Sequence, residues 1–248
     1  DVAPSRGLGD VYKRQLYNGV FNFVNGSNST GNEYVFDKNG NLQQDYNKKV
    51  AKVQYNQLNL PSVLQFINGN RVDYLYDADG IKRLVTHKIA IANISVPMGQ
   101  IKDLTNSQIS QTQTTDYCGN VIYENRILSK IQTEEGYITL NGNSPTYHYY
   151  LKDHQGNNRI VINQTGAIEQ INHYYPFGGV FEVNTSTSGI QPYKYNGKEL
   201  DRMHGLDYYD YSARMYDATL GRFTTVDPMV EKYYSMSPYA YCAKNPVN

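Results

Sequence analysis

The stretch Tyr74-Leu-Tyr-Asp-Ala-Asp-Gly80 decides the fold, because an aromatic strand motif runs directly into a turn that opens with aspartate and closes with glycine. Tyr34-Val-Phe-Asp-Lys-Asn-Gly40 repeats this arrangement. The aspartate of such a turn accepts hydrogen bonds from backbone amides two residues on, and glycine takes the positive φ that closes the turn. Alternating aromatic and β-branched residues fit a pleated strand. Each stretch therefore predicts a strand that ends in a tight turn.

Turn residues recur along the chain at intervals of about 20 residues. Four turns share the same opening and closing residues: Asp37 and Gly40, Asp77 and Gly80, Asp116 and Gly119, and Asp153 and Gly156. A unit of this size is one strand-turn-strand module, which is too small to bury its own apolar face, so neighbouring modules must stack. The sequence predicts an all-β fold of tandem hairpins whose strands pair edge to edge.

Composition supports a sheet protein and excludes several partners. The chain of 248 residues has 25 tyrosines and no tryptophan, and only 19% of its residues are charged. We expect the tyrosine rings to pack on a thin sheet while their hydroxyls reach water. The 23 basic and 23 acidic side chains give zero formal net charge, which provides no electrostatic basis for binding nucleic acid or an anionic membrane.

Other classes of function lack their sequence signals. Apolar stretches such as 89–96 are too short to span a bilayer. The two cysteines, Cys118 and Cys242, are too few for a disulfide framework, and we expect Cys242 to be a small packed residue in a short helix. The five histidines lack the spacing of a metal site, and no glycine-rich phosphate loop precedes a helix. We therefore expect no metal and no cofactor.

The chain divides into four parts by composition. Residues 1–15 resemble translated adapter sequence and contain no signal peptide, so we exclude them from the fold and interpret the chain as a fragment cut at both ends. Residues 16–180 are predicted to form the hairpins, with 101–115 as the least regular part. Residues 181–189 are rich in serine and threonine and predict a flexible loop. Residues 190–248 form a tighter carboxyl-terminal part.

Short elements are expected in the carboxyl-terminal part. The sequence predicts a turn or helix over 198–203, short strands over 207–211 and 213–216, and a turn over 217–221. Two short helices are expected near 229–234 and 238–243, the second with Pro238 at its first position.

Several carboxyl-terminal motifs carry a family resemblance. They are Tyr193-Lys-Tyr-Asn-Gly-Lys-Glu-Leu200, Gly205-Leu-Asp-Tyr-Tyr-Asp-Tyr211, Ala213-Arg-Met-Tyr-Asp217, Leu220-Gly-Arg-Phe223 and Asp227-Pro228. In order and spacing they resemble the Rhs repeat-associated core domain, in versions associated with Bacteroidetes. Tyr149-Tyr-Leu-Lys-Asp-His-Gln-Gly-Asn157 and His173-Tyr-Tyr-Pro-Phe-Gly178 resemble the segment before that core, and the Asp-to-Gly turns resemble the family's tyrosine-aspartate (YD) repeats.

This resemblance implies part of a large curved β-shell, spiralled from YD-type hairpins, that encloses a variable carboxyl-terminal toxin. It implies a secreted or cell-surface polymorphic toxin of interbacterial competition. Its partners would be the protein's own toxin domain, and also secretion machinery and an immunity protein. Many members cleave the chain before the toxin with acidic residues of paired Asp-Pro-x-Gly motifs.

Only one such motif is present, Asp227-Pro228-Met229-Val230, and valine replaces its glycine. Asp227 is the candidate catalytic residue of the intact protein, with Arg214 and Arg222 as possible supports. Two carboxylates must share a proton for this chemistry, and Asp207, Asp210 and Asp217 are possible partners but are more typical of turns. The arginines are as well explained by structural ion pairs or by stacking on tyrosine. We expect this chain by itself not to be an enzyme.

Two alternatives remain open from the sequence. Stacked aromatic hairpins also occur in adhesins and carbohydrate-binding repeats, although those rest heavily on tryptophan. A β-propeller enzyme would have units of about 40 residues with four strands each, and the spacing of Asp37, Asp77 and Asp116 allows it.

Overall fold

The computed structural model describes residues 23, 25–27, 31–142, 144–182 and 191–247. Strands dominate these residues, and the helices are single 3₁₀ turns. The elements in chain order are β1 (Tyr34–Phe36), β2 (Leu42–Asp45), β3 (Val50–Tyr55), β4 (Pro61–Phe66), β5 (Arg71–Tyr76), β6 (Lys82–Ala90), η1 (Asn106–Gln108), β7 (Ile109–Cys118), β8 (Val121–Glu124), β9 (Ile127–Gln132), β10 (Gly136–Asn141), β11 (Ser144–Lys152), β12 (Asn158–Asn163), β13 (Ile168–Tyr174), β14 (Val180–Glu182), η2 (Tyr195–Gly197), β15 (Glu199–Asp201), η3 (Met203–Gly205), β16 (Tyr208–Asp210), β17 (Met215–Asp217), β18 (Arg222–Phe223), η4 (Val230–Lys232) and η5 (Cys242–Lys244).

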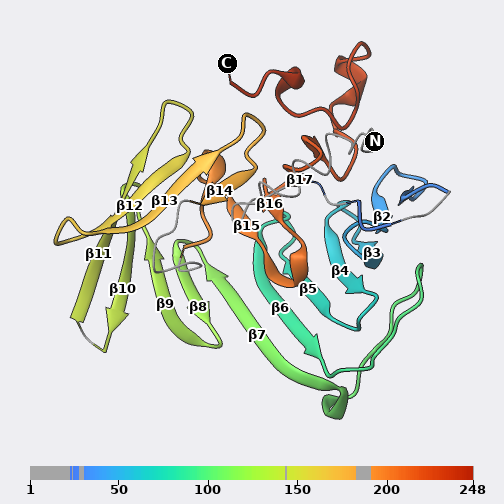
Figure 1. Cartoon of the computed structure of the whole chain (residues 1–248), viewed down its shortest axis with the longest axis horizontal. Helices are drawn as coiled ribbons and strands as arrows, with labels where there is room; N and C mark the ends of the chain where they lie inside the picture. Colours follow the sequence, from blue (N-terminus) through green and yellow to red (C-terminus); the bar gives the residue numbers. More distant parts are fainter. Residues whose placement is uncertain (1–22, 24, 28–30, 143, 183–190, 248) are drawn as a thin grey trace, which may run out of the picture.

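Strands β1 to β14 form one 14-stranded sheet in which each strand pairs antiparallel with the next strand of the chain. This sheet bends into an arc, and the small four-stranded sheet β15–β18 lies inside the arc (Figure 1). The predicted all-β fold of sequential hairpins is confirmed. The propeller alternative is wrong, because the sheet runs on through all fourteen strands and is not divided into separate blades of four.

One five-residue turn is used repeatedly between strands. At Asp37 the carboxylate Oδ1 accepts hydrogen bonds from the amides of Asn39 and Asn41, at 2.9 and 2.8 Å, and Gly40 closes the turn with a φ of +77°. Turns that start at Asn56, Asp77, Asp153 and Asn163 make the same pair of bonds. Asparagine serves as well as aspartate because its Oδ1 accepts the same bonds.

Asp116 does not form such a turn, which corrects the prediction for the Asp116–Gly119 stretch. It lies within β7, directly opposite Leu84 on β6 and Tyr123 on β8. Because Cys118 still pairs with Val121, only Gly119 and Asn120 connect β7 to β8. A two-residue hairpin loop is tight enough to need no side-chain acceptor at its start.

Replacing Asp37 with alanine is expected to lower the free energy of unfolding by about 1 kcal/mol, because two turn amides lose their acceptor. Asp116→Ala is the matched control, and its expected effect is below about 0.5 kcal/mol. Urea denaturation of both variants measures the difference. Equal losses would show that the turn hydrogen bonds contribute nothing specific.

The apolar core has two parts, one on each face of the small sheet. Tyr208 on β16 joins Val50, Leu64, Val72 and other side chains of the large sheet. Tyr209, the next residue, points the other way and packs with Val180, Tyr195, Leu200, Tyr216, Ala218, Phe223 and Tyr241. Successive strand residues alternate between faces, so neighbouring tyrosines enter different clusters. The expectation of a thin, wet sheet is therefore wrong, because tyrosine rings fill a two-layer core here.

The carboxyl-terminal part differs in detail from its prediction. The stretch 198–203, expected to be a turn or helix, contains strand β15, because Leu200 pairs with Tyr209 and is buried. The two expected helices are reduced to η4 and η5, and Pro238 precedes η5 by several residues without starting it. The irregular stretch 101–115 includes the first residues of β7, which pairs with β6 from Ile109 onward.

The predicted boundaries fall partly on residues that the structure does not describe. Residues 1–15 and 183–189 lie outside the described residues. Residues 181 and 182 belong to β14, the last strand of the large sheet. The second sheet starts at Glu199, within the fourth part.

Candidate functional site

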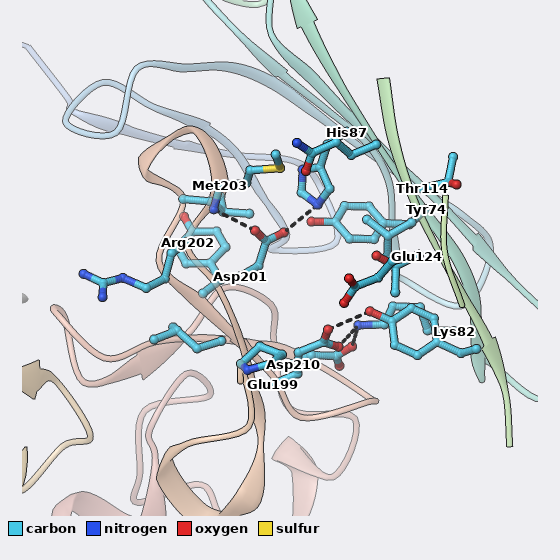
Figure 2. Close-up of a pocket in the computed structure, with 18 of the residues that line it drawn as sticks. Tyr74, Lys82, His87, Thr114, Glu124, Glu199, Asp201, Arg202, Met203 and Asp210 are labelled. Carbon is cyan, nitrogen blue, oxygen red and sulfur yellow. Dashed lines mark hydrogen bonds and ion pairs between the residues drawn. The ribbon is translucent and has the colours of Figure 1, made fainter. Parts of the chain in front are cut away.

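A cavity of about 370 Å³ lies between the concave face of the large sheet and the small sheet. Strands β6 and β7 and the β8–β9 turn line one side, and β15, η3 and β16 line the other. Figure 2 shows Lys82 of the large sheet facing Glu199 and Asp210 of the small sheet, and His87 facing Asp201. This interface is the candidate functional site, because it joins the arc to the part of the chain inside it.

Lys82 of β6 holds the two sheets together through ion pairs. Its Nζ lies 2.8 Å from Oε2 of Glu199 and 2.5 Å from Oδ2 of Asp210, both on the small sheet. The hydroxyl of Tyr117 on β7 donates to the other oxygen of Glu199 at 2.7 Å. The lysine side chain is only 13% exposed, so these contacts are little screened by water.

The charges of this cluster are mutually dependent. Burial by itself would lower the pKa of Lys82, but the negative charge of Glu199 and the other facing groups outweighs it, and the pKa lies well above the ordinary lysine range. Burial and Glu199 raise the pKa of Tyr117, so its hydroxyl remains a donor. The cluster is satisfied at neutral pH and offers neither a free base nor a free nucleophile.

A second cluster at the same interface joins Asp201 of β15 to two histidines. Oδ2 of Asp201 lies 3.5 Å from Nε2 of His87 on β6, and the ring of His204 lies 5.5 Å from that of His87. Nδ1 of His204 is in turn 3.0 Å from the side-chain amide of Asn70. Asp201 faces the cavity, which leaves its side chain 24% exposed although protein surrounds it.

The environment shifts all three pKa values. Burial raises the pKa of Asp201 to about 7, with a smaller opposing effect from the amide of Met203. Burial lowers the pKa of His87 to about 4, and burial together with His87 lowers the pKa of His204 to about 4. Both imidazoles are therefore neutral at pH 7, and Asp201 keeps its proton to a much higher pH than an exposed aspartate.

Asp201→Asn is expected to make the protein more stable at pH 8 by about 4 kcal/mol, and this advantage should nearly vanish by pH 4. A carboxyl whose pKa is raised by folding destabilises the folded protein when it is ionised. This penalty is absent at low pH and accumulates as the pH rises from about 4 to about 7. Asparagine carries no such penalty. Urea denaturation of both proteins at several pH values measures the difference, and an advantage independent of pH would contradict the assigned shift.

A third contact between the sheets lies near the β2–β3 turn. Nζ of Lys48 donates to the carbonyl of Leu206 at 2.8 Å, lies 3.3 Å from Oδ2 of Asp217, and sits 4.6 Å from the ring centre of Tyr208. The neighbouring Asp45 is 1% exposed, and burial raises its pKa. A single lysine thus balances two buried carboxyl groups contributed by different sheets.

Asp227, the predicted catalytic residue, lies outside the interface cavity. Its Oδ2 forms an ion pair of 2.7 Å with Nη2 of Arg214, and its Oδ1 accepts the amide of Met229 at 2.8 Å. The Arg214 guanidinium also stacks 3.7 Å from the ring centre of Phe223. Asp227 is the one carboxylate among the described residues that line the adjoining cavity of about 230 Å³.

The structure does not bring the other predicted residues to Asp227. Arg222 lies 5.2 Å from the ring centre of Tyr34. Asp207 pairs with Arg202, Asp210 with Lys82, and Asp217 with Lys48. Each possible partner carboxylate is thus held by a cation elsewhere, and a carboxylate pair of the aspartic-protease kind is not formed among these residues.

Sequence reasoning missed the residues that join the two sheets. Lys82, His87 and Lys48 lie on strands or turns where a charged residue usually faces solvent, so nothing in their spacing signals burial. Cys242 also differs from its prediction, because both it and Cys118 are free and exposed.

The described residues contain no group of three or more histidine, cysteine or acidic side chains arranged to hold a metal ion. None of the helices in the described part of the chain is long and apolar enough to cross a bilayer.

Several solved structures share the fold of this chain. No protein-family model matches the chain. The TcdB2-TccC3 crystal structure matches 86% of this chain with a TM-score of 0.61 and 19% identity. The Photorhabdus luminescens Tc holotoxin pore matches 86% with a TM-score of 0.60 and 18% identity. The chain has the fold of part of these proteins.

A curated relative is similar over almost the whole chain. Salivary gland surface protein 1 of Aedes aegypti is 28% identical over 256 residues, which cover 96% of this chain. The chain spans only 7% of that protein's length and 10 to 11% of the two matched structures. A further TcdB2-TccC3 structure, described as lacking its hypervariable carboxyl-terminal region, matches with a TM-score of 0.59 and 17% identity.

Proposed function

We propose that this chain is a wall segment of an Rhs-type shell that encloses a toxin domain. The observation that carries the proposal is the 14-stranded sheet, whose strands follow chain order and bend into an arc around the small sheet (Figure 1). A sheet built this way can be lengthened by adding hairpins beside β1, the first strand of the sheet among the described residues, so it suits a wall of any length. The shared fold with Tc toxin proteins and the Rhs-type motifs support the same function.

The mechanism of such a wall is containment. The small sheet is fixed to the concave face by buried ion pairs at Lys82 and Lys48 and by the core around Tyr208. These contacts stiffen the arc and set its curvature. The enclosed partner is the toxin domain of the longer protein, and a secreted or cell-surface location follows from that role. Secretion machinery and an immunity protein are the further partners of this proposal.

The proposed role requires no catalysis by this chain. The negative charge of Asp227 is paired with Arg214, and no second carboxylate lines its cavity among the described residues. Self-cleavage would need a second acidic residue from outside the described part of the chain. The carbohydrate-binding alternative is not favoured, because much of the tyrosine surface it would use lies in the core.

Electron microscopy of the longer protein that contains this chain tests the proposal. The expected result is a hollow particle whose wall contains these hairpins, with the small sheet on its inner side. A solid particle without a lumen would overturn the proposal.

The isolated chain is expected to self-associate through its open edge strand, and a monodisperse, thermostable monomer in light scattering would argue against a wall segment. Binding to a glycan array would favour the alternative.

A further inference from the structure

Two histidines from different sheets lie side by side at the interface, His87 on β6 and His204 in η3. Their ring centres are 5.5 Å apart. Nδ1 of His87 and Nε2 of His204 are buried and have no hydrogen-bond partner among the described residues. A charged imidazole donates from both ring nitrogens, so each ring, once protonated, would leave a buried N–H group without an acceptor. The geometry of the interface therefore favours neutral rings.

The hydrogen bonds of Asn70 fix His204 in its neutral form. Oδ1 of Asn70 accepts the backbone amide of Ala90 at 2.9 Å, which leaves its Nδ2 group 3.0 Å from Nδ1 of His204. An amide Nδ2 can only donate, so Nδ1 of the histidine is the acceptor and carries no proton. A proton added there would face the hydrogens of Asn70, and an attractive contact would become a repulsive one.

The other charged groups around the histidine pair are matched with one another. The ion pairs are Lys82 with Glu199 and Asp210, Arg202 with Asp207, and Lys130 with Glu124. On the strands that flank β6, His87 lies directly opposite Val72 and Gln113, which carry no charge. Tyr74 is neutral as well, because burial raises the pKa of its phenol.

Asp201 is the carboxyl group that contacts the pair. Its Oδ2 lies 3.5 Å from Nε2 of His87, as Figure 2 shows. Burial raises the pKa of Asp201 to about 7, so this group becomes neutral on acidification before the imidazoles take up protons. It therefore supplies little negative charge to stabilise protonated rings.

We propose that η3 and β15 form an acid-released latch, in which protonation of His87 and His204 separates these two elements from the concave face of the large sheet. His204 has a φ of +59°, a left-handed conformation that is unfavourable for histidine, so η3 relieves backbone strain when it leaves. The latch acts on the joint between the sheets and does not depend on what the wall encloses. Its test is therefore independent of the proposed shell function.

The direction of the pH response follows from three groups. Burial lowers the pKa of His87 and of His204 to about 4, so both disfavour the closed latch as the pH falls below the ordinary histidine value of 6.5. Protonation of Asp201 favours the closed latch over the same range. Two histidines outweigh one aspartate, so the open fraction is expected to be about tenfold higher at pH 5 than at pH 7.

Hydrogen–deuterium exchange of the 248-residue chain, read by mass spectrometry at pH 5 and pH 7, tests the latch. After correction for the intrinsic exchange rates, the amides of residues 199–210 should open about tenfold more often at pH 5. His154→Gln is the matched control, because that histidine is exposed in the turn between β11 and β12, and it should respond like the wild-type chain.

The double variant His87→Gln, His204→Asn removes both titrating rings. Asparagine tolerates the left-handed backbone of residue 204 and keeps an acceptor oxygen. Asp201 then acts alone, so the response should change sign, with opening about 50-fold rarer at pH 5 than at pH 7. Opening in the wild-type chain that does not rise on acidification, or that rises equally in the double variant, would overturn the proposal.

Asn70→Asp reverses the polarity of the contact with His204. A carboxylate can accept both the amide of Ala90 and a proton on Nδ1 of the histidine, so it stabilises the charged ring inside the interface. Opening in this variant should no longer rise between pH 7 and pH 5. A rise equal to that of the wild-type chain would overturn the assignment of His204 as a proton sensor.

Discussion

Lys82→Met is expected to lower the free energy of unfolding by about 3–5 kcal/mol, because it leaves two carboxylates at a buried interface without their cation. Methionine keeps the length and most of the volume of lysine, so the loss reports charge and not packing. The hydroxyl of Tyr117 still donates to Glu199, but one neutral donor does not replace the ion pairs. Urea denaturation measures the change.

Two further variants separate the charge effect from a general loss of structure. Lys152→Met, at an exposed lysine, should change the stability by less than about 0.5 kcal/mol. Adding Glu199→Gln and Asp210→Asn to Lys82→Met should recover most of the lost stability, because no unpaired charge is then buried. If the triple variant is as unstable as the single one, the interface depends on packing and the ion pairs are incidental.

Tyr216→Ala is expected to lower the free energy of unfolding by about 3–5 kcal/mol, because it opens a cavity at the centre of the tyrosine cluster. Tyr216 is completely buried, and its ring lies 4.3 Å from that of Tyr241 and 5.6 Å from that of Phe223. Tyr216→Phe keeps the ring and loses only the hydroxyl bond to the carbonyl of Phe177, so its expected loss is about 1 kcal/mol.

The ratio of these two losses in the free energy of unfolding shows whether the tyrosine ring is packed in a core or lies on the protein surface. Similar losses for Tyr216→Ala and Tyr216→Phe would show that the hydroxyl dominates and that the ring contributes little. Thermal unfolding of both variants gives an independent check. Loss of a packed ring should lower the unfolding temperature, or broaden the transition, far more than loss of a hydroxyl. Tyr234→Ala is the matched control, because that ring is 86% exposed.

The hairpins were predictable because their signals are local. An aspartate accepts amides within its own turn, and glycine at Gly40 or Gly80 relieves the strain of a positive φ, whatever the rest of the chain does. The same logic failed at Asp116, where pairing on both sides of β7 extends the strand through a sequence that resembles a turn. Where a local preference and strand pairing disagree, pairing of many residues outweighs one turn.

The interface between the sheets was beyond sequence reasoning because its partners are far apart in the chain. Lys82 meets Glu199, His87 meets Asp201, and Lys48 meets Asp217 only because the small sheet folds back into the arc. At Asp227 the sequence did anticipate Arg214 as a neighbour, but only the structure showed that Asp207, Asp210 and Asp217 pair with cations elsewhere. Charge pairing across such distances depends on the curvature of the sheet, which no short motif encodes.

The sequence by itself determined that this protein is a succession of antiparallel hairpins, because turn chemistry and strand alternation act over a few residues. Only the tertiary structure decided that the sheet bends around a second sheet, that neighbouring tyrosines of the small sheet enter two different core clusters, and that buried ion pairs join the two sheets. These features depend on packing between segments far apart in the chain. Their energies arise when water is excluded between the two sheets, a condition that exists only once both are in place.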